Sequence, residues 1–259
     1  MKNRLSRIIK PKTGRTVMLA VDHGYFMGPT TGLEKLDETV KPLLPYADTL
    51  MPTRGALRNY IDPNADIPIV LRVSGGTSIL SKELLREGIT VSIKDAIRLN
   101  VSGMAFSIMV GSEHERDTLL GLTEIIDAGE EYGIPVLAVT AVGKEIGQKD
   151  ARYMALCCRI AAELGVHIVK TYFCEGFEKV VESCPVPIVV AGGKKVPEKD
   201  ALEMAYNAVS AGAVGVDMGR NIFQSEDPVA MIQAARAVVH ENATPDEAYS
   251  IFESKKSGE

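Results

Sequence analysis

The sequence contains few cysteines and no long hydrophobic run. The 259 residues include four cysteines, whose spacing is not that of a metal site. Two of them are adjacent and would point in different directions on a helix, so we expect reduced thiols. No run approaches the roughly 18 consecutive apolar residues of a membrane-spanning helix. The four cysteines are Cys157, Cys158, Cys174 and Cys184.

Positively charged residues are fewer than negatively charged ones. The chain carries 29 Lys and Arg against 34 Asp and Glu, a formal net charge of −5. It therefore lacks the basic surface that nucleic acid binding requires. Basic residues do cluster between Lys2 and Arg15, where we expect a solvated terminal segment. This segment lacks the apolar core of an export signal, so we expect a cytoplasmic protein.

What the sequence does contain is a series of short apolar runs rich in β-branched residues. These runs are separated mostly by segments of helical period, which is typical of βα units around a parallel sheet. They predict a (β/α)8 TIM barrel in one domain, residues 1–259. A doubly wound open sheet would more often have a glycine-rich first turn, which DHGYFMGPT does not supply. The eight predicted strands are residues 16–21, 49–51, 68–73, 104–110, 135–140, 166–171, 186–191 and 213–218.

The segments between these runs carry signals for helix starts. Ser92 with Asp95, and Ser112 with Glu115, resemble capping boxes, in which each side chain binds the other residue's backbone N–H. Residues 244–247, with the sequence TPDE, resemble the capped start of a further helix. We therefore expect one extra helix after the last barrel helix.

One charged residue interrupts the sixth apolar run. Lys170 stands in VHIVKT where a buried β-branched residue would be expected, and an unpaired buried ammonium costs several kcal/mol. One interpretation is a strand-end lysine paired with a neighbouring carboxylate. The other is an amine that attacks a carbonyl to form an imine, after burial or a nearby cation such as Lys194 or Arg220 has helped it to lose its proton.

Acid/base candidates follow the first predicted strand. The active site of a TIM barrel lies at the C-terminal ends of its strands, so the residues that close each strand are informative. Asp22 and His23 occupy this position and can transfer protons. The same DHG sequence would also suit a turn that leaves His23 at the rim.

Glycines and cations after the seventh and eighth runs predict a phosphate site. Barrels often bind phosphate with these two loops, where backbone N–H groups approach the anion closely. The sequence GGKK supplies Gly192, Gly193 and Lys194, and GRN supplies Gly219 and Arg220. Ordinary turns with solvated cations are the alternative. We expect a phosphorylated small molecule as the substrate.

Metal and thiol chemistry are less well supported by the sequence. The four histidines do not gather at one rim of the predicted barrel, so we expect no metal site and disfavour a divalent-metal aldolase. Cys174 follows Lys170 closely and would be a candidate thiol nucleophile. Free cysteines, however, more often behave as small hydrophobic residues.

Five motifs occur together and in order: DHGYFMGPTTGLE, TRG, VKTYF, VAGGKK and DMGRNIFQ. With them, the chain resembles the DeoC/FbaB-type class I aldolase family, from about Arg4 to the C-terminal helix. The resemblance implies a TIM barrel, a Schiff-base lysine at Lys170 and a phosphate site in the GGKK and GRN loops. It also implies a ring-stacked homo-oligomer, expected to be a decamer.

Two stretches favour one branch of this family. DHGYFMGPTTGLE and AVTAVGK resemble the branch that processes phosphorylated autoinducer-2, in which coenzyme A is the co-substrate and accepts an acetyl group from a phosphorylated dione. Relatives that act on fructose 1,6-bisphosphate, or that make an aminoheptulosonate, carry a catalytic tyrosine after the fifth strand, where this chain reads VTAVGK. The resemblance thus implies an acyltransferase with no bound cofactor.

In that reaction we expect Lys170 to form the imine and Asp22 to manage its proton. His23 would deprotonate the thiol or protonate the enamine. A class I aldolase acting on a sugar phosphate is one alternative, and a phosphosugar-binding barrel without catalysis is another.

Overall fold

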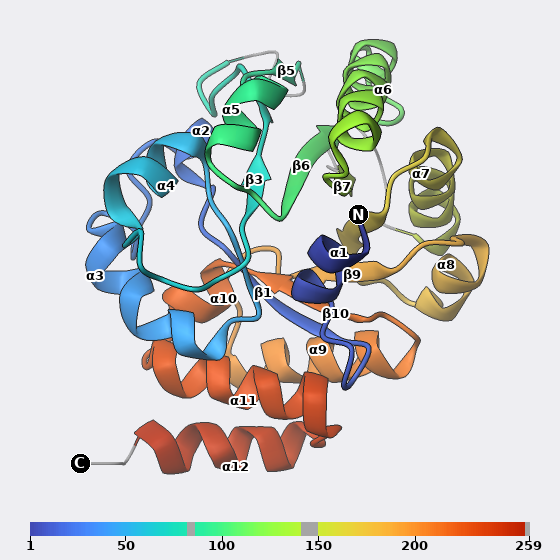
Figure 1. Cartoon of the computed structure of the whole chain (residues 1–259). Coiled ribbons are helices and arrows are strands. Elements are labelled where there is room, and N and C mark those ends of the chain that lie inside the picture. The colour runs from blue at the N-terminus through green and yellow to red at the C-terminus, as the bar shows by residue number, and fades with distance from the viewer. Residues whose placement is uncertain (82–85, 141–149, 257–259) are drawn as a thin grey trace.

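The computed structural model describes residues 1–81, 86–140 and 150–256, and parallel strands form its centre, surrounded by helices (Figure 1). The barrel strands are β1 (Thr16–Ala20), β2 (Thr49–Met51), β3 (Val70–Arg72), β6 (Gly103–Ile108), β7 (Val136–Thr140), β8 (Ile168–Tyr172), β9 (Ile188–Ala191) and β10 (Gly215–Met218). They are hydrogen-bonded in the order β2-β1-β10-β9-β8-β7-β6-β3. A parallel bridge between Leu50 and Ile69 joins the two ends of this order. The sheet is therefore a nearly closed ring, and the predicted TIM barrel is confirmed.

All eight predicted strands are present, with ends that differ from the predictions by a few residues. Their apolar runs are detectable because a parallel barrel strand is buried on both faces. The antiparallel pair β4 (Ser74–Gly75) and β5 (Gly88–Ile89) was not predicted. Strands of two residues are too short to show any alternation of apolar and polar side chains.

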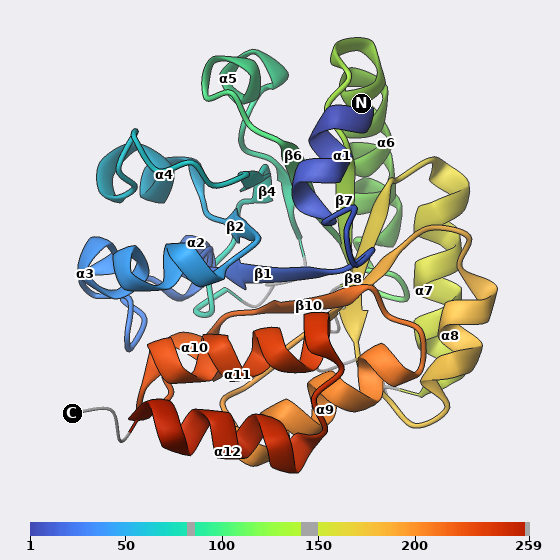
Figure 2. The ribbon, with the colours of Figure 1, turned by 60° about the horizontal axis from the view of Figure 1, so that its bottom comes forward.

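The helices fill the space outside the ring, and α12 lies against α9 and α11 on the outer surface (Figure 2). No described helix combines the length and the apolar composition needed to cross a membrane. The helices are α1 (Lys2–Ile8), α2 (Gly24–Met27), α3 (Leu36–Val40), the 3-10 helix η1 (Lys41–Tyr46), α4 (Arg54–Tyr60), α5 (Ile93–Arg98), α6 (Glu115–Tyr132), α7 (Ala151–Leu164), α8 (Phe177–Ser183), α9 (Glu198–Ser210), α10 (Arg220–Phe223), α11 (Pro228–Glu241) and α12 (Pro245–Lys256).

Two of the three predicted helix starts are confirmed. The Ser92 hydroxyl accepts from the Asp95 N–H at the start of α5. At the start of α12, Thr244 and Glu247 each accept from the other's backbone N–H, so the predicted extra helix has a complete capping box. Ser112 is not the cap of α6, which begins three residues later. Its hydroxyl instead donates to a carbonyl of the preceding loop.

Helix α1 closes the N-terminal mouth of the barrel. Ile8 is buried and packs with barrel-interior side chains such as Met18. Arg4 donates to the carbonyls of Val101 and Gly133, which precede β6 and β7. Lys2 and Arg7 are exposed, as expected of a solvated segment, whereas the expectation is wrong for Arg4, whose guanidinium satisfies loop carbonyls. The opposite mouth, at the C-terminal ends of the strands, remains for the active site.

Candidate active site

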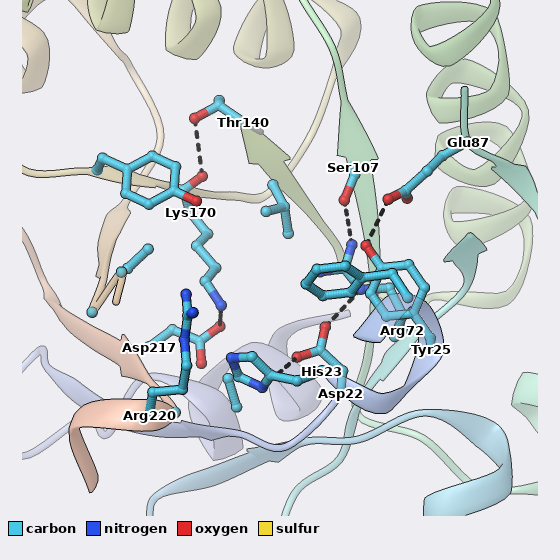
Figure 3. Close-up of a pocket in the computed structure, with 18 of the residues that line it drawn as sticks. Asp22, His23, Tyr25, Arg72, Glu87, Ser107, Thr140, Lys170, Asp217 and Arg220 are labelled. Atoms are coloured by element: carbon cyan, nitrogen blue, oxygen red, sulfur yellow. Dashed lines mark hydrogen bonds and ion pairs between the residues drawn. The ribbon is translucent and has the colours of Figure 1, made fainter. Parts of the chain in front are cut away.

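A cavity of about 210 Å³ opens at the C-terminal end of the barrel, and side chains from several strands converge on it (Figure 3). Most of the residues singled out from the sequence line this cavity, although they come from strands far apart in the chain. Those brought together are Asp22, His23, Lys170, Gly192, Gly193, Gly219 and Arg220. The exception is Lys194, which is exposed and is not part of the lining.

Lys170 of β8 forms a buried ion pair with Asp217 of β10. The distance between Lys170 Nζ and Asp217 Oδ2 is 2.9 Å, and the two side chains are 10% and 0% exposed. Apart from this ion pair, neither carboxylate oxygen has a hydrogen-bond partner in the described part of the chain. Burial raises the pKa of Asp217 even though the adjacent Lys170 acts to lower it. Asp217 is thus well placed to accept a proton from the lysine.

This pair changes the expectation for how Lys170 loses its proton. The sequence suggested a nearby cation, whereas the direct neighbour is a carboxylate. Asp217 was missed, although it interrupts the apolar run of residues 213–218 as Lys170 interrupts its own run. The pairing of the two residues was not evident, because they belong to different strands. The paired lysine of the first interpretation is therefore present, but it lines a cavity instead of an ordinary strand end.

Asp22, at the end of β1, is held by an arginine. Arg72 Nε donates to Asp22 Oδ2 at 2.8 Å, and both side chains are buried. Burial is the largest influence and acts to raise the pKa of Asp22, but Arg72, Lys170 and His23 outweigh it and hold that pKa below its usual value. Asp22 is therefore an anion at neutral pH, balanced by Arg72, and the direct contact with the lysine belongs to Asp217.

Arg72, which the sequence reasoning missed, is the centre of a buried hydrogen-bond network (Figure 3). Its Nη1 donates to the hydroxyls of Ser74 and Ser107. Glu87 accepts from the Ser74 hydroxyl and from the Tyr25 hydroxyl, each at 2.6 Å. A signal was available, since the arginine interrupts the apolar run PIVLRV just as the lysine interrupts VHIVKT.

His23 is neutral in this environment. Burial is the main reason that its pKa falls to about 4; Asp22 acts in the opposite direction, while Lys170 and Arg220 lower it further. The ring packs edge-on against Phe223, with 5.4 Å between the ring centroids. Its Nδ1 has no hydrogen-bond partner within the described residues. This nitrogen lies 3.9 Å from Asp22 Oδ1, beyond hydrogen-bond distance (Figure 3). With a pKa of about 4, the neutral imidazole is a weak base at pH 7 and can hold a proton only transiently.

The loops after β9 and β10 are tied together by Asn221, a fully buried side chain. Its Nδ2 donates to the carbonyl of Gly192 at 2.7 Å and to that of Lys194 at 3.2 Å, and its Oδ1 accepts from Val196 N–H at 2.9 Å. Beside them, Nε of Arg220 is buried and has no hydrogen-bond partner among the residues described. An unpaired guanidinium N–H beside glycine backbone suits a bound anion.

Two tyrosines line the cavity, but neither comes from the segment after β7, the fifth barrel strand. The AVTAVGK stretch is described only to Thr140, which lines the cavity; residues 141–149 lie outside the described residues. Tyr25 and Tyr172 also line the cavity. The hydroxyl of Tyr25 donates to Glu87, and burial raises its pKa, so it remains protonated at neutral pH.

The arrangement of side chains around the cavity also bears on the thiol and metal hypotheses. The four cysteines are free and buried. Cys174 does not line the cavity, and burial, assisted by Asp150 and Glu178, raises the pKa of its thiol, which disfavours a nucleophilic thiolate. In residues 1–81, 86–140 and 150–256, no group of three or more His, Cys, Asp or Glu side chains is arranged to hold a metal ion.

Comparisons with known proteins agree with this geometry. A sequence model described as DeoC/LacD family aldolase matches residues 16–225. The 3-hydroxy-5-phosphonooxypentane-2,4-dione thiolase of Salmonella typhimurium is 56% identical over 258 residues, which are 99% of this chain and 88% of the relative. The thiolase of the same name from Escherichia coli is 54% identical over 257 residues, with the same coverage. An archaeal fructose-1,6-bisphosphate aldolase, whose catalytic lysine is bound to the carbinolamine intermediate, aligns with a TM-score of 0.83 at 25% identity, over 92% of this chain and 98% of that one.

Proposed function

The chain belongs to the DeoC/LacD family of aldolases, and we propose that it transfers an acetyl group from 3-hydroxy-5-phosphonooxypentane-2,4-dione to coenzyme A. The products are acetyl-CoA and dihydroxyacetone phosphate, in the breakdown of phosphorylated autoinducer-2. The observation that carries the proposal is the buried pair of Lys170 and Asp217, which lines a cavity that also contains the glycine loops after β9 and β10.

The reaction begins with the neutral amine of Lys170. Its proton passes to Asp217, 2.9 Å away, whose raised pKa favours the uncharged acid. Removing both charges suits a buried site, because an ion pair there is poorly solvated. The amine then attacks C4 of the dione to form a carbinolamine. Asp217 returns its proton to the hydroxyl group, which leaves as water, and the product is a protonated imine. C4 is the carbon attacked because the imine must lie next to C3, where negative charge develops.

The substrate phosphate binds at the other end of the same ligand. Backbone N–H groups of Gly192, Gly193 and Gly219 and the unpaired Nε of Arg220 supply the donors. Lys194 was predicted for the same role. Its carbonyl accepts a hydrogen bond from Asn221, whereas its side chain is exposed and would have to turn inward to reach the anion.

Carbon–carbon cleavage then needs the thiol as an acceptor. His23 is neutral at pH 7 but a weak base, so it accepts the thiol proton only as the sulfur attacks the C2 carbonyl, and no free thiolate accumulates. The C2–C3 bond breaks, its electrons enter the imine to form an enamine, and C2 leaves as acetyl-CoA. The protonated His23 gives the proton taken from the thiol to C3 of the enamine, and addition of water to the resulting imine releases dihydroxyacetone phosphate and the free lysine. The fixed anion of Asp22 stabilises the cationic imine.

Further features of the proposal come from the family resemblance. Coenzyme A is a co-substrate and not a bound cofactor, the enzyme acts in the cytoplasm, and it assembles as a homo-oligomer, expected to be a decamer. Membership of an aldolase family favours an enzyme over the alternative of a barrel that only binds phosphosugars.

A comparison of two substrates tests the function. The purified protein is incubated with the phosphorylated dione and, separately, with fructose 1,6-bisphosphate, each with and without coenzyme A. We expect acetyl-CoA and dihydroxyacetone phosphate only from the dione, and only when coenzyme A is present. Rapid cleavage of fructose 1,6-bisphosphate without coenzyme A would contradict the proposal.

That contrary result would support a second candidate, a class I aldolase acting on a sugar phosphate. One observation favours it: Tyr172 lines the cavity two residues after Lys170, so an acid/base tyrosine is available although none follows β7. The acyltransferase has stronger support, because the relatives named as thiolases are more than twice as similar in sequence as the archaeal aldolase.

A further inference from the structure

A second cavity, of about 220 Å³, lies beside the active-site cavity. Tyr25 and Arg72 line both, so the two cavities meet at these two side chains. The second cavity lies between the start of α4 and the β3–β4 segment. Its charged lining residues in the described part of the chain are Arg54 and Arg72, without a carboxylate. Its remaining lining is neutral, with small residues such as Gly75 and Gly76.

The second cavity lies across the barrel from the glycine loops. Around the closed ring, β3 is four strands from β9 in either direction. A phosphate bound after β9 and β10 therefore lies on the side of the barrel opposite β3. The β3 side remains for a second reactant, whose thiol must reach C2 of the substrate held on Lys170.

Arg54 belongs to an arginine cluster, defined as Arg54, Arg58 and Arg98, around a single carboxylate. The distances from these arginines to the carboxylate oxygens of Asp95 are 2.8, 2.9 and 3.4 Å, respectively. Three guanidinium groups surround one carboxylate, so these four side chains together have a net charge of +2. The chain as a whole has a net charge of −5. One arginine would suffice to neutralise Asp95, so the cluster has spare donors for a phosphate.

We propose that the second cavity and the arginine cluster bind the phosphates of coenzyme A. The thiol arm then passes Tyr25 into the active-site cavity, where its sulfur meets the substrate on Lys170. This inference rests on the proposed function, which requires coenzyme A as the acetyl acceptor. Guanidinium groups hold phosphate oxygens with paired hydrogen bonds, whereas the neutral cavity wall admits the uncharged arm.

Coenzyme A and pantetheine provide the test, because pantetheine has the same thiol arm without the nucleotide and its phosphates. Steady-state cleavage of the dione is measured with each acceptor. We expect Arg54→Ala to raise the KM for coenzyme A about tenfold, since a charge-assisted hydrogen bond is lost, and to leave the KM for pantetheine unchanged. High salt should raise the KM for coenzyme A in the wild-type enzyme.

Two further variants complete the design. Arg98→Ala, which removes a side chain that is 70% exposed, should raise the KM for coenzyme A to a smaller extent, and it replaces Arg54→Ala if that variant fails to fold. Arg116→Ala is the matched control, because this arginine on α6 is 82% exposed and lies outside both cavities. Its KM values should equal those of the wild type.

The outcomes separate this inference from the proposed function. If folded variants show no change for coenzyme A, or equal changes for both acceptors, the docking site is wrong while the acyl transfer is unaffected. A rise in the KM for the dione instead would assign the arginine cluster to the substrate phosphate and would also overturn the inference. A wild-type enzyme that forms the imine but never uses coenzyme A would overturn both.

Discussion

Lys170 and Asp217 face each other across 2.9 Å in the wall of the active-site cavity. A buried carboxyl group with a raised pKa can take the lysine proton and later return it, which an ordinary surface ion pair does not do. The sequence shows Asp217 as a charge within an apolar run, but it does not show that Lys170 is its partner, because this pairing depends on the approach of β10 to β8. The lysine itself was predictable, since a cation in an apolar run is unusual.

Replacing Asp217 with asparagine tests this proton transfer. Asp217→Asn keeps the shape of the side chain but removes the acceptor, so we expect imine formation and kcat to fall by about 100-fold or more. The measurement is the rate at which borohydride traps the imine, followed across pH. Asp117→Asn, at an exposed position on α6, is the control. Unchanged trapping rates in a folded Asp217→Asn variant would show that another group accepts the proton.

His23 makes a prediction about stability and pH. In the folded protein its pKa is about 4, whereas a histidine in an unfolded chain has a pKa of about 6.5. As the pH falls from about 6.5 to 4, the unfolded chain takes up a proton that the folded chain refuses, so the free energy of unfolding decreases. The difference in pKa corresponds to about 3 kcal/mol over this window.

The contribution of His23 is isolated by comparison with His23→Gln. Urea unfolding at pH 7, 6, 5 and 4 should show that the free energy of unfolding falls more steeply with decreasing pH in the wild type than in the variant, because the variant lacks this histidine. Other groups, including Asp217 with its raised pKa, titrate in both proteins and cancel in the difference. Parallel curves would mean that His23 is not buried as a neutral group.

At the scale of elements, the end of β10 must pass very close to β1. A Cβ added at Gly219 would lie 2.4 Å from Cε1 of His23 and 2.6 Å from the carbonyl oxygen of Ala20. This glycine therefore has a packing role beside its predicted phosphate role. The close approach brings the loop after β10 against His23, for which we propose an acid/base role.

We expect Gly219→Ala to destabilise the fold by about 1–3 kcal/mol, because the backbone oxygen of Ala20 cannot move aside as a flexible side chain would. Thermal unfolding measures the effect. Gly24→Ala is the matched control, since an added Cβ there meets no atom within 4 Å. Equal melting temperatures for the two variants would contradict the predicted clash.

The helices and strands also show which parts of the fold could be predicted from the sequence. The eight barrel strands were predictable because each is a local run of buried apolar residues, and the α12 start was predictable because Thr244 and Glu247 satisfy each other within one turn. The Arg72 network could not be predicted, because its members come from segments far apart in the chain. Arg72 lies 50 residues from Asp22 and 35 residues from Ser107. Only closure of the ring brings such residues together.

At the scale of the whole molecule, we propose that residues 1–259 form one domain. The main hydrophobic cluster includes residues from Val17 in β1 to Phe252 in α12, so the first strand and the last helix share one core. We expect far-ultraviolet circular dichroism and tyrosine fluorescence to give coincident urea unfolding curves. Protein concentration must be held constant, because the expected homo-oligomer makes stability concentration-dependent. Separate transitions would indicate more than one folding unit.

The most direct test of acetyl transfer through Lys170 is the mass of the adduct that borohydride traps on the enzyme. Without coenzyme A, Lys170 should carry the intact five-carbon phosphorylated dione. With coenzyme A, the same lysine should carry the three-carbon phosphorylated fragment, because the acetyl group has left as acetyl-CoA. An adduct on a different residue, or a Lys170 adduct whose mass does not respond to coenzyme A, would contradict the proposed reaction.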